Sequence, residues 1–195
     1  MFLSMRQDFI YDFIFRLEMN FKVKKSNILF RGKVFDLKVD EIEYESGNTG
    51  IREIVIHPGG AVVVPVKDNG KIIMVNQFRH PFQKKVLELP AGKLDSNEDP
   101  YNCAIRELEE ETGYRANKIE KLGYIYTSPG FSSEILHIYL ANELIPGNHN
   151  REEGEHDMEL LEFTFNEVEE KIKNNEIVDS KSICGIYLAK EKVMV

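Results

Sequence analysis

The alternation of apolar and polar residues divides the N-terminal part of the chain into short extended segments. Apolar and polar residues alternate within 27–44 on both sides of a break at 31–33, which predicts two strands. The apolar run 51–57 follows a glycine-containing turn. These segments predict a small antiparallel sheet. The β-branched runs at 61–66 and 71–77 flank Asp68-Asn69-Gly70, which predicts a hairpin, because Asn-Gly is typical of two-residue hairpin turns.

The middle of the chain contains a helix with clear ends. Residues 86–89 predict a short strand, and Asp99 is a good N-cap ahead of Pro100, a residue that suits the first helical position. Gly113 supplies the left-handed residue that ends many helices. The later expected elements are strands at 121–127, 135–141 and 160–164, a helix at 166–174 with Asn166 as its cap, and a helix at 179–190.

Composition and charge exclude several classes of protein. The 195 residues are 42% hydrophobic and 30% charged, which fits one core with a small appendage, and the net charge of −8 gives no broad basic surface for nucleic acid. Cys103 and Cys184 have no zinc spacing and are expected to be free thiols in a reducing cytoplasm. No segment is apolar enough to span a membrane. Residues 1–18 have helical periodicity, lack a signal-peptide pattern, and are expected to be an extension or to precede a true start at Met19.

The predicted central helix carries an unusual density of carboxylates. Its crowded acidic residues are Glu107, Glu109, Glu110 and Glu111, with Arg106 beside them. Like charges three or four residues apart repel each other on a helix, so a bound divalent cation would relieve the cost. A solvated acidic face is the alternative, but it would not explain why Gly92, Glu98 and Gly113 stand at fixed offsets from the helix.

The stretch 92–114 resembles the Nudix box at all of its fixed positions. They are Gly92, Glu98, Arg106, Glu107, Glu110, Glu111 and Gly113. Residues 53–142 look like the ADP-ribose pyrophosphatases of this superfamily, and the loop 128–131 is the narrower marker. The resemblance implies an α/β/α sandwich with a mixed sheet and a small N-terminal antiparallel β subdomain. It divides the chain into an extension (1–26), a dimerisation subdomain (27–57) and a hydrolase domain (58–195).

The resemblance also implies a reaction and its cofactor. The expected activity is Mg²⁺-dependent hydrolysis of ADP-ribose to AMP and ribose 5-phosphate, with Mn²⁺ as an alternative ion. The expected protein is a cytoplasmic homodimer whose N-terminal subdomain crosses to the partner. The alternatives are hydrolysis of another nucleoside diphosphate sugar and a non-catalytic regulator that binds ADP-ribose.

Residue roles follow from the same resemblance. The expected metal ligands are the Ala91 carbonyl and the carboxylates of Glu107, Glu111 and Glu110, although Glu110 could instead support the ligands without touching the metal. Arg106 would clamp Glu110 and Glu98, while Gly92, Glu98 and Gly113 would be structural. The expected substrate residues are Arg52, Glu53, Arg79, Pro129, Gly130, Phe131, Ser133 and Glu134. The charged ones could instead form surface ion pairs, and Phe131 could belong to the core.

The resemblance also implies a general base in the acidic loop 152–159, because relatives often carry it in an acidic loop before a late strand. Glu155 is the first candidate, Glu153 the second and His156 the third, since an imidazole titrates near neutral pH. The alternative is a solvated loop, with the base elsewhere.

Overall fold

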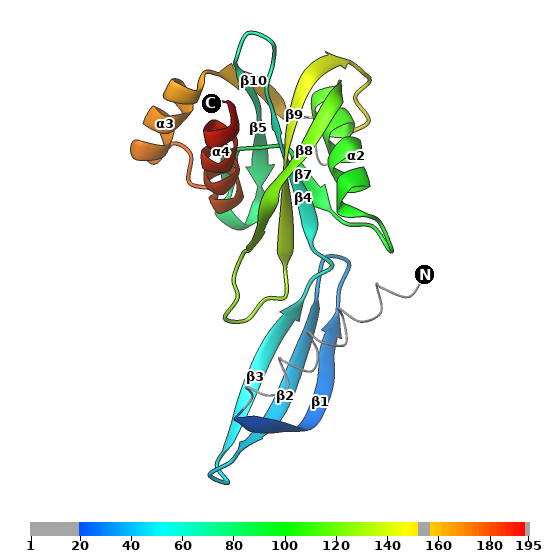
Figure 1. Ribbon diagram of the computed structural model, residues 1–195. Helices are drawn as coiled ribbons and strands as arrows, with labels where there is room; N and C mark the ends of the chain where they lie inside the picture. The colour runs from blue at the N-terminus through cyan, green and yellow to red at the C-terminus, as the bar shows by residue number, and fades with distance from the viewer. Residues whose placement is uncertain (1–19, 152–156, 194–195) are drawn as a thin grey trace, which may run out of the picture. The chain divides into compact units, whose positions relative to one another are not determined.

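The computed structural model describes residues 20–151 and 157–193 (Figure 1). The chain divides into two compact units, and the boundary in the sequence lies between His57 and Pro58. No helix among the described residues is long and apolar enough to cross a membrane.

The first unit is a three-stranded antiparallel sheet in the order β1-β2-β3. Its strands are β1 (Phe21–Arg31), β2 (Asp36–Tyr44) and β3 (Thr49–Ile56). The antiparallel sheet was expected, but β1 begins at Phe21 and not at residue 27, so the expected boundary of the extension falls inside a strand. A register shift between Val23 and Lys25 interrupts the regular alternation there, and most of the strand is exposed.

The second unit contains two sheets. The larger has the order β7-β4-β9-β8, and the smaller has the order β10-β5-β6. The larger sheet comprises β4 (Gly60–Pro65), β7 (Ala91–Lys93), β8 (Tyr114–Tyr126) and β9 (Ile135–Pro146). The smaller comprises β5 (Ile72–Arg79), β6 (Lys84–Glu88) and β10 (Glu159–Phe163). The larger sheet is mixed: β4 and β9 pair in parallel, while the pairs β4–β7 and β8–β9 are antiparallel.

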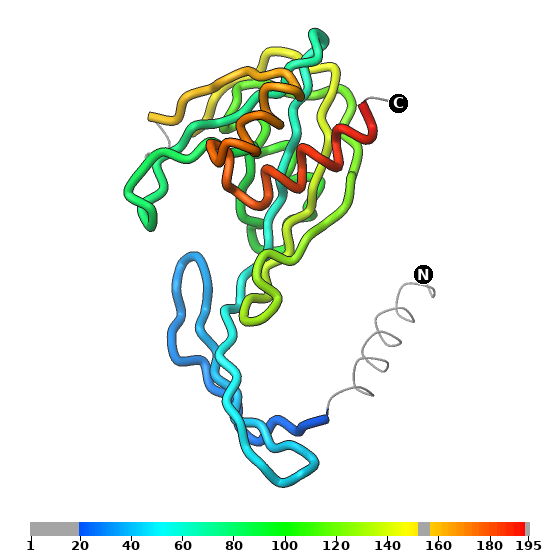
Figure 2. The backbone as a smooth tube through the Cα atoms, turned by 90° about the vertical axis from the view of Figure 1, so that its left-hand side faces the viewer, coloured from blue at the N-terminus to red at the C-terminus, as the bar shows by residue number. Residues whose placement is uncertain are grey.

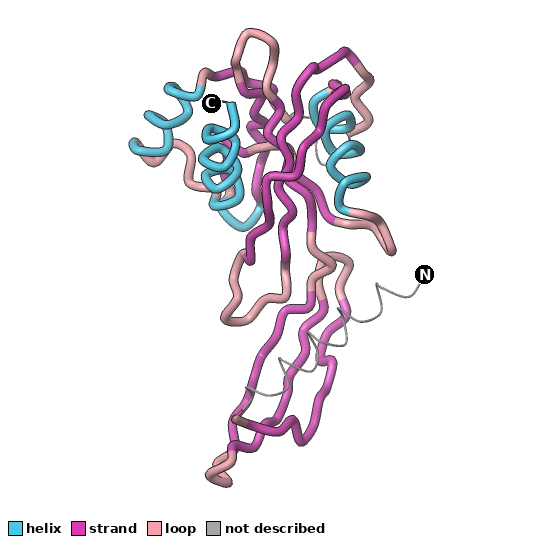
Figure 3. Tube along the Cα trace, viewed as in Figure 1, coloured by secondary structure: helices cyan, strands magenta, loops and turns pink. Residues whose placement is uncertain are grey.

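Helices cover both faces of the larger sheet. They are α2 (Pro100–Thr112), α3 (Phe165–Lys173) and α4 (Ser180–Val193). Alternate residues of β4 divide between two clusters: Ala61 and Val63 pack with α2, while Val62 and Val64 pack with α4. Figure 3 shows these helical layers on either side of the strands, and in Figure 2 α4 lies across them. The expected α/β/α sandwich is therefore confirmed.

The hairpin expected at 61–77 forms only its turn. The Lys67 N–H donates to the Lys71 carbonyl at 2.9 Å, and Val66 bridges Ile72, but β4 and β5 then enter different sheets. Both edges of β4 are taken by β7 and β9, and every residue of β4 is buried. The hairpin prediction was wrong beyond the turn, because long-range pairings compete with the local one.

Two element boundaries also differ from expectation. Strand β8 begins at Tyr114, directly after the α2 terminus, and not at residue 121. The cap of α3 is Thr164 and not Asn166: the Glu167 N–H donates to the Thr164 hydroxyl, and the Thr164 N–H donates to the Glu167 carboxylate at 2.7 Å. This reciprocal pair is a capping box, readable from its Thr-x-x-Glu spacing.

Candidate active site

Helix α2 presents its acidic residues from a well-defined frame. The Asp99 carboxylate accepts the Tyr101 N–H at 2.9 Å, and Gly113 ends the helix with a φ of 70°. Both caps were expected. The Glu107 side chain is 11% exposed, and Glu111 as a whole residue is 2% exposed. Buried carboxylates are rare without partners, so their surroundings matter.

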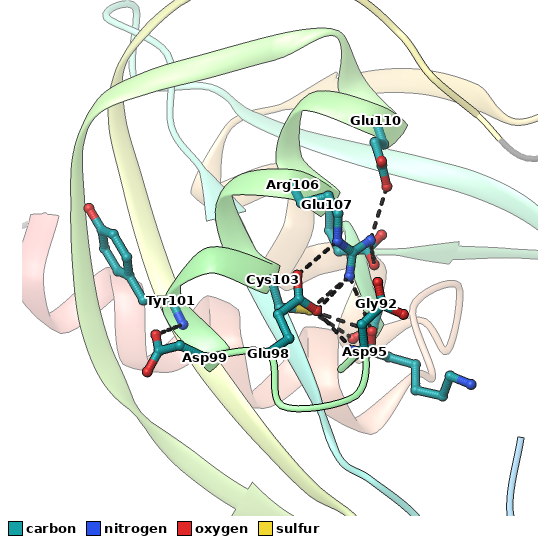
Figure 4. A network of polar contacts seen from close by, with 10 residues as sticks. Gly92, Asp95, Glu98, Asp99, Tyr101, Cys103, Arg106, Glu107 and Glu110 are labelled. Atoms are coloured by element: carbon teal, nitrogen blue, oxygen red, sulfur yellow. Dashed lines mark hydrogen bonds and ion pairs between the residues drawn. The ribbon is translucent and has the colours of Figure 1, made fainter.

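Arg106 binds three of the box carboxylates (Figure 4). Its Nε and Nη2 each donate to Glu98 at 2.9 Å, a bidentate pair. Its Nη1 donates to Glu107 at 2.6 Å and to Glu110 at 3.0 Å. A guanidinium suits this arrangement because its donors form a rigid planar fork. The structure thus places Arg106 where the sequence predicted a clamp, with Glu107 as an additional partner.

Glu98 joins this clamp to the loop ahead of the helix. Its carboxylate also accepts the Asp95 N–H at 2.9 Å, and its own N–H donates to the Asp95 carbonyl. The hydrogen bonds from Arg106 lower the pKa of Glu98 to about 2, against the opposing effect of burial. The same contacts raise the pKa of Arg106. Glu98 is therefore ionised and tied to both the helix and the loop.

The strand β7 approaches α2 so closely that the Glu107 carboxylate occupies the space where a side chain on Gly92 would begin. A Cβ on Gly92 would overlap the Glu107 carboxylate. One residue earlier, the Ala91 N–H donates to Glu111 Oε2 at 3.1 Å. Ala91, Gly92, Glu107 and Glu111 therefore lie together, as the sequence predicted.

The expected substrate loop 128–134 closes on itself between β8 and β9. The Ser132 N–H donates to the Ser128 carbonyl at 2.8 Å, and the Thr127 hydroxyl donates to Glu134 at 2.7 Å. Phe131 is 57% exposed, so this residue is not part of the core.

The other expected substrate residues have different surroundings. Arg79, at the end of β5, forms a bidentate ion pair with Glu88. Arg52 and Glu53 belong to the first unit, where Arg52 donates to the Tyr44 hydroxyl at 2.6 Å.

Glu153, Glu155 and His156 lie outside the described residues, but the segment next to them is anchored to α2. Arg151 donates through Nε and Nη2 to the Glu111 carbonyl at 3.0 and 2.8 Å, and through Nη1 to the Met158 carbonyl at 2.8 Å. Sequence reasoning missed this residue, and only its position beside the acidic loop could have signalled it.

Sequence reasoning also missed Glu88. A carboxylate within the apolar run 86–89 signals a buried ion pair, since an unpaired charge there would be costly.

The donor chemistry of this region fits a divalent cation. Glu107, Glu110, Glu111 and the Ala91 carbonyl offer only oxygen, which hard cations such as Mg²⁺ prefer. Within residues 20–151 and 157–193, no group of three or more His, Cys, Asp or Glu side chains is already arranged to hold a metal. Because Arg106 binds Glu107 and Glu110, metal binding would require these carboxylates to share or exchange that partner.

Comparisons with known proteins agree with this geometry. The family model described as "NUDIX domain" matches residues 56–183. An ADP-ribose pyrophosphatase of Bacillus subtilis (strain 168) is 46% identical over 159 residues, covering 81% of this chain and 86% of that protein. A methanol dehydrogenase activator of Bacillus methanolicus is 41% identical over 175 residues, covering 89% and 95%. A solved structure of an ADP compounds hydrolase superimposes with a TM-score of 0.80 at 18% identity, covering 90% of this chain and 95% of that one.

Proposed function

Because this chain belongs to the NUDIX domain family, we propose that it is a metal-dependent diphosphatase that hydrolyses ADP-ribose to AMP and ribose 5-phosphate. The observation that carries the proposal is the convergence of the α2 carboxylates on the Ala91–Gly92 backbone. An ADP-ribose pyrophosphatase 46% identical over most of the chain supports the choice of substrate.

Mg²⁺ is the proposed cofactor, with Mn²⁺ as the alternative, and when bound it would neutralise diphosphate charge and make water more acidic. The proposed ligands are Glu107, Glu110, Glu111 and the Ala91 carbonyl. Arg106 holds Glu107 and Glu110 in place, and Gly92 lets the Glu107 carboxylate lie against the backbone of β7. The proposed substrate contacts are Arg52, Glu53, Arg79, Pro129, Gly130, Phe131, Ser133 and Glu134.

Turnover of ADP-ribose tests this function directly. AMP release should require Mg²⁺, and Glu111→Gln should lower kcat by about a thousand-fold or more, because the amide lacks the charge a divalent cation needs. Glu109→Gln is the matched control: Glu109 lies on the same helix but pairs with Arg115 at 2.7 Å, so its turnover should stay close to that of the unaltered chain. The proposal fails if ADP-ribose is not cleaved or if Glu111→Gln keeps full activity. Faster cleavage of another nucleoside diphosphate sugar would move the assignment to that substrate.

The proposed general base is Glu155, followed by Glu153 and His156. The anchoring of residue 151 to the Glu111 carbonyl supports this choice, because it ties the start of that segment to the proposed metal helix. The general base can be identified with three separate variants, Glu155→Gln, Glu153→Gln and His156→Asn. The variant that removes the base should no longer show the fall in kcat at acidic pH. An unchanged fall in all three would place the base elsewhere.

We also propose that the protein is a cytoplasmic homodimer in which the first unit contacts the partner. The first unit exposes large apolar residues, including Leu29 (65%) in β1 and Val34 (58%) in the turn between β1 and β2, and exposed apolar surface of this kind marks interfaces. The free thiols at Cys103 and Cys184 agree with a reducing compartment. Light scattering on the full chain should give twice the monomer mass, and Leu29→Glu should shift it toward the monomer; a monomeric unaltered chain would refute the dimer.

A further inference from the structure

A buried ion cluster joins α4 to the end of β6. The Glu88 side chain is only 4% exposed and accepts hydrogen bonds from Arg79 Nε at 2.7 Å and Nη2 at 2.8 Å. Lys181, in the first turn of α4, also donates to Glu88 and binds Asp179 at 2.9 Å. The Lys181 side chain is 13% exposed, so this contact is largely removed from water.

The charges of this cluster balance. Arg79 and Lys181 face Glu88 and Asp179, so two cations meet two carboxylates. Burial opposes ionisation of Glu88, but the hydrogen bonds from Arg79 and the positive charges of Lys181 and Arg79 outweigh it and keep the pKa of Glu88 below its usual range. Without Lys181, the Arg79 guanidinium would be the remaining cation for both carboxylates.

The cluster is continuous with the proposed metal helix. The Leu89 N–H donates to the buried Ser182 hydroxyl at 2.7 Å, and the Ala91 N–H donates to Glu111 at 3.1 Å. Residues 88–91 are therefore held by α4 at one end and by α2 at the other. Gly185 lets α4 lie close, because a Cβ there would be 2.7 Å from the Leu89 side chain.

Arg79 has binding capacity beyond this ion pair. Within residues 20–151 and 157–193, its Nη1 has no hydrogen-bond partner. Arg79 and Lys181 line a cavity of about 480 Å³, together with the apolar side chains of Phe82 and Val178. The negative charge of Glu111 acts on the guanidinium, after the stronger effect of Glu88. Arg79 therefore lies near enough to the metal helix to be acted on by one of its carboxylates, and it borders the cavity as well.

We propose that Lys181 is a positioning residue for the diphosphate: it fixes Glu88, which in turn fixes the Arg79 guanidinium with Nη1 available to a substrate phosphate. This inference rests on the proposed diphosphatase function. The contrasting role is a purely structural ion pair, such as the one that Lys190 of the same helix forms with Glu169 at 2.5 Å. A structural pair stabilises the fold but has no specific dependence on Arg79.

A double-mutant cycle between Lys181 and Arg79 distinguishes the two roles. Lys181→Met should lower kcat/KM for ADP-ribose by about ten-fold, since small displacements of a phosphate-binding group are costly. In the Arg79→Gln background, Lys181→Met should change kcat/KM by less than about two-fold, because the guanidinium through which Lys181 acts is already gone. Equal factors in both backgrounds would overturn the proposal. Lys181→Arg should retain most activity, and Lys181→Gln gives the same comparison if the methionine variant does not fold.

Two further measurements isolate the effect. Lys190→Met should lower the unfolding temperature yet leave kcat/KM within about two-fold of the unaltered chain, since it removes an ion pair of the same helix away from Glu88. In the second measurement, calorimetry without added metal gives the dissociation constant for inorganic pyrophosphate for the four proteins of the double-mutant cycle. A chain that binds pyrophosphate without cleaving ADP-ribose refutes the proposed function alone. The positioning role alone is refuted if Arg79→Gln leaves the affinity for pyrophosphate unchanged. It is also refuted if Lys181→Met changes that affinity by the same factor in both backgrounds.

Discussion

Replacing Arg106 by Met tests the central clamp of the site. The guanidinium binds Glu98, Glu107 and Glu110, and the side chains of Glu98 and Glu107 are 14% and 11% exposed. Methionine keeps much of the length of the side chain but leaves these carboxylates without their cation. Removing one partner of a buried ion pair costs about 3–5 kcal/mol, and Arg106 is itself 29% exposed, so we expect a loss of about 3 kcal/mol at pH 7.

The loss should depend on pH in a definite direction. The pKa of Glu98 falls from 4.5 to about 2 on folding, so its stabilisation is fully present above pH 4.5 and is lost as the pH falls toward 2. One pKa unit corresponds to about 1.4 kcal/mol, and titration between these limits removes about 2 kcal/mol by pH 3, or about 1 kcal/mol after screening by solvent. The difference in the free energy of unfolding between the unaltered chain and Arg106→Met should therefore become about 1–2 kcal/mol smaller when the pH falls from 7 to 3.

Urea unfolding followed by circular dichroism, in the presence of a chelator, measures both effects. Arg115→Met is the matched control, because Arg115 pairs with Glu109 of the same helix while its own side chain is 57% exposed. That change should cost less than about 1 kcal/mol and show little pH dependence. The stabilising role of Arg106 would be refuted if Arg106→Met lowered the free energy of unfolding by less than about 1 kcal/mol. It would also be refuted if the difference from the unaltered chain stayed constant down to pH 3.

Further predictions concern close packing and the buried thiol. Gly92→Ala should lower Mg²⁺-dependent turnover by about a hundred-fold with an unchanged circular dichroism spectrum, because the new Cβ displaces the Glu107 carboxylate; turnover near that of the unaltered chain would contradict the close approach. Gly113→Ala should cost about 1–2 kcal/mol in urea unfolding, since φ is 70° there, and an unchanged midpoint would argue against the left-handed cap. Burial, followed by the charges of Glu107 and Glu98, raises the pKa of Cys103 to about 12, so in a Cys184→Ser background a disulfide reagent at pH 8 should label the protein only after unfolding; labelling of the folded chain would refute the burial.

Local signals in the sequence predicted the parts of the fold that depend on local physics. The cap at Asp99 and the left-handed Gly113 set both ends of α2, because capping requires only neighbouring residues. The partner of β4 was not predictable in the same way. Its Asn-Gly turn favours pairing with β5, but β7 and β9 occupy both edges of β4, and local sequence does not reveal such long-range partners.

The same distinction holds for the site. The spacing of the box placed Arg106 beside Glu98 and Glu110, and these contacts span only eight and four residues. The Glu88–Lys181 contact joins positions 93 residues apart, so no periodicity or local motif contains it. What the sequence did offer was the charge of Glu88 inside an apolar strand, which requires a partner without saying which residue supplies it.

The acidic helix is less strained than its sequence suggests, because each of its four crowded carboxylates has a hydrogen-bond partner. Glu109 turns to Arg115, Glu107 and Glu110 share Arg106, and Glu111 accepts a backbone N–H. Contacts within the chain thus offset part of the repulsion between like charges along the helix. If Glu107 and Glu110 are metal ligands as proposed, a bound cation would compete with Arg106 for their carboxylates. The strength of the contacts of Arg106 should then influence metal affinity, although Arg106 is itself no proposed ligand.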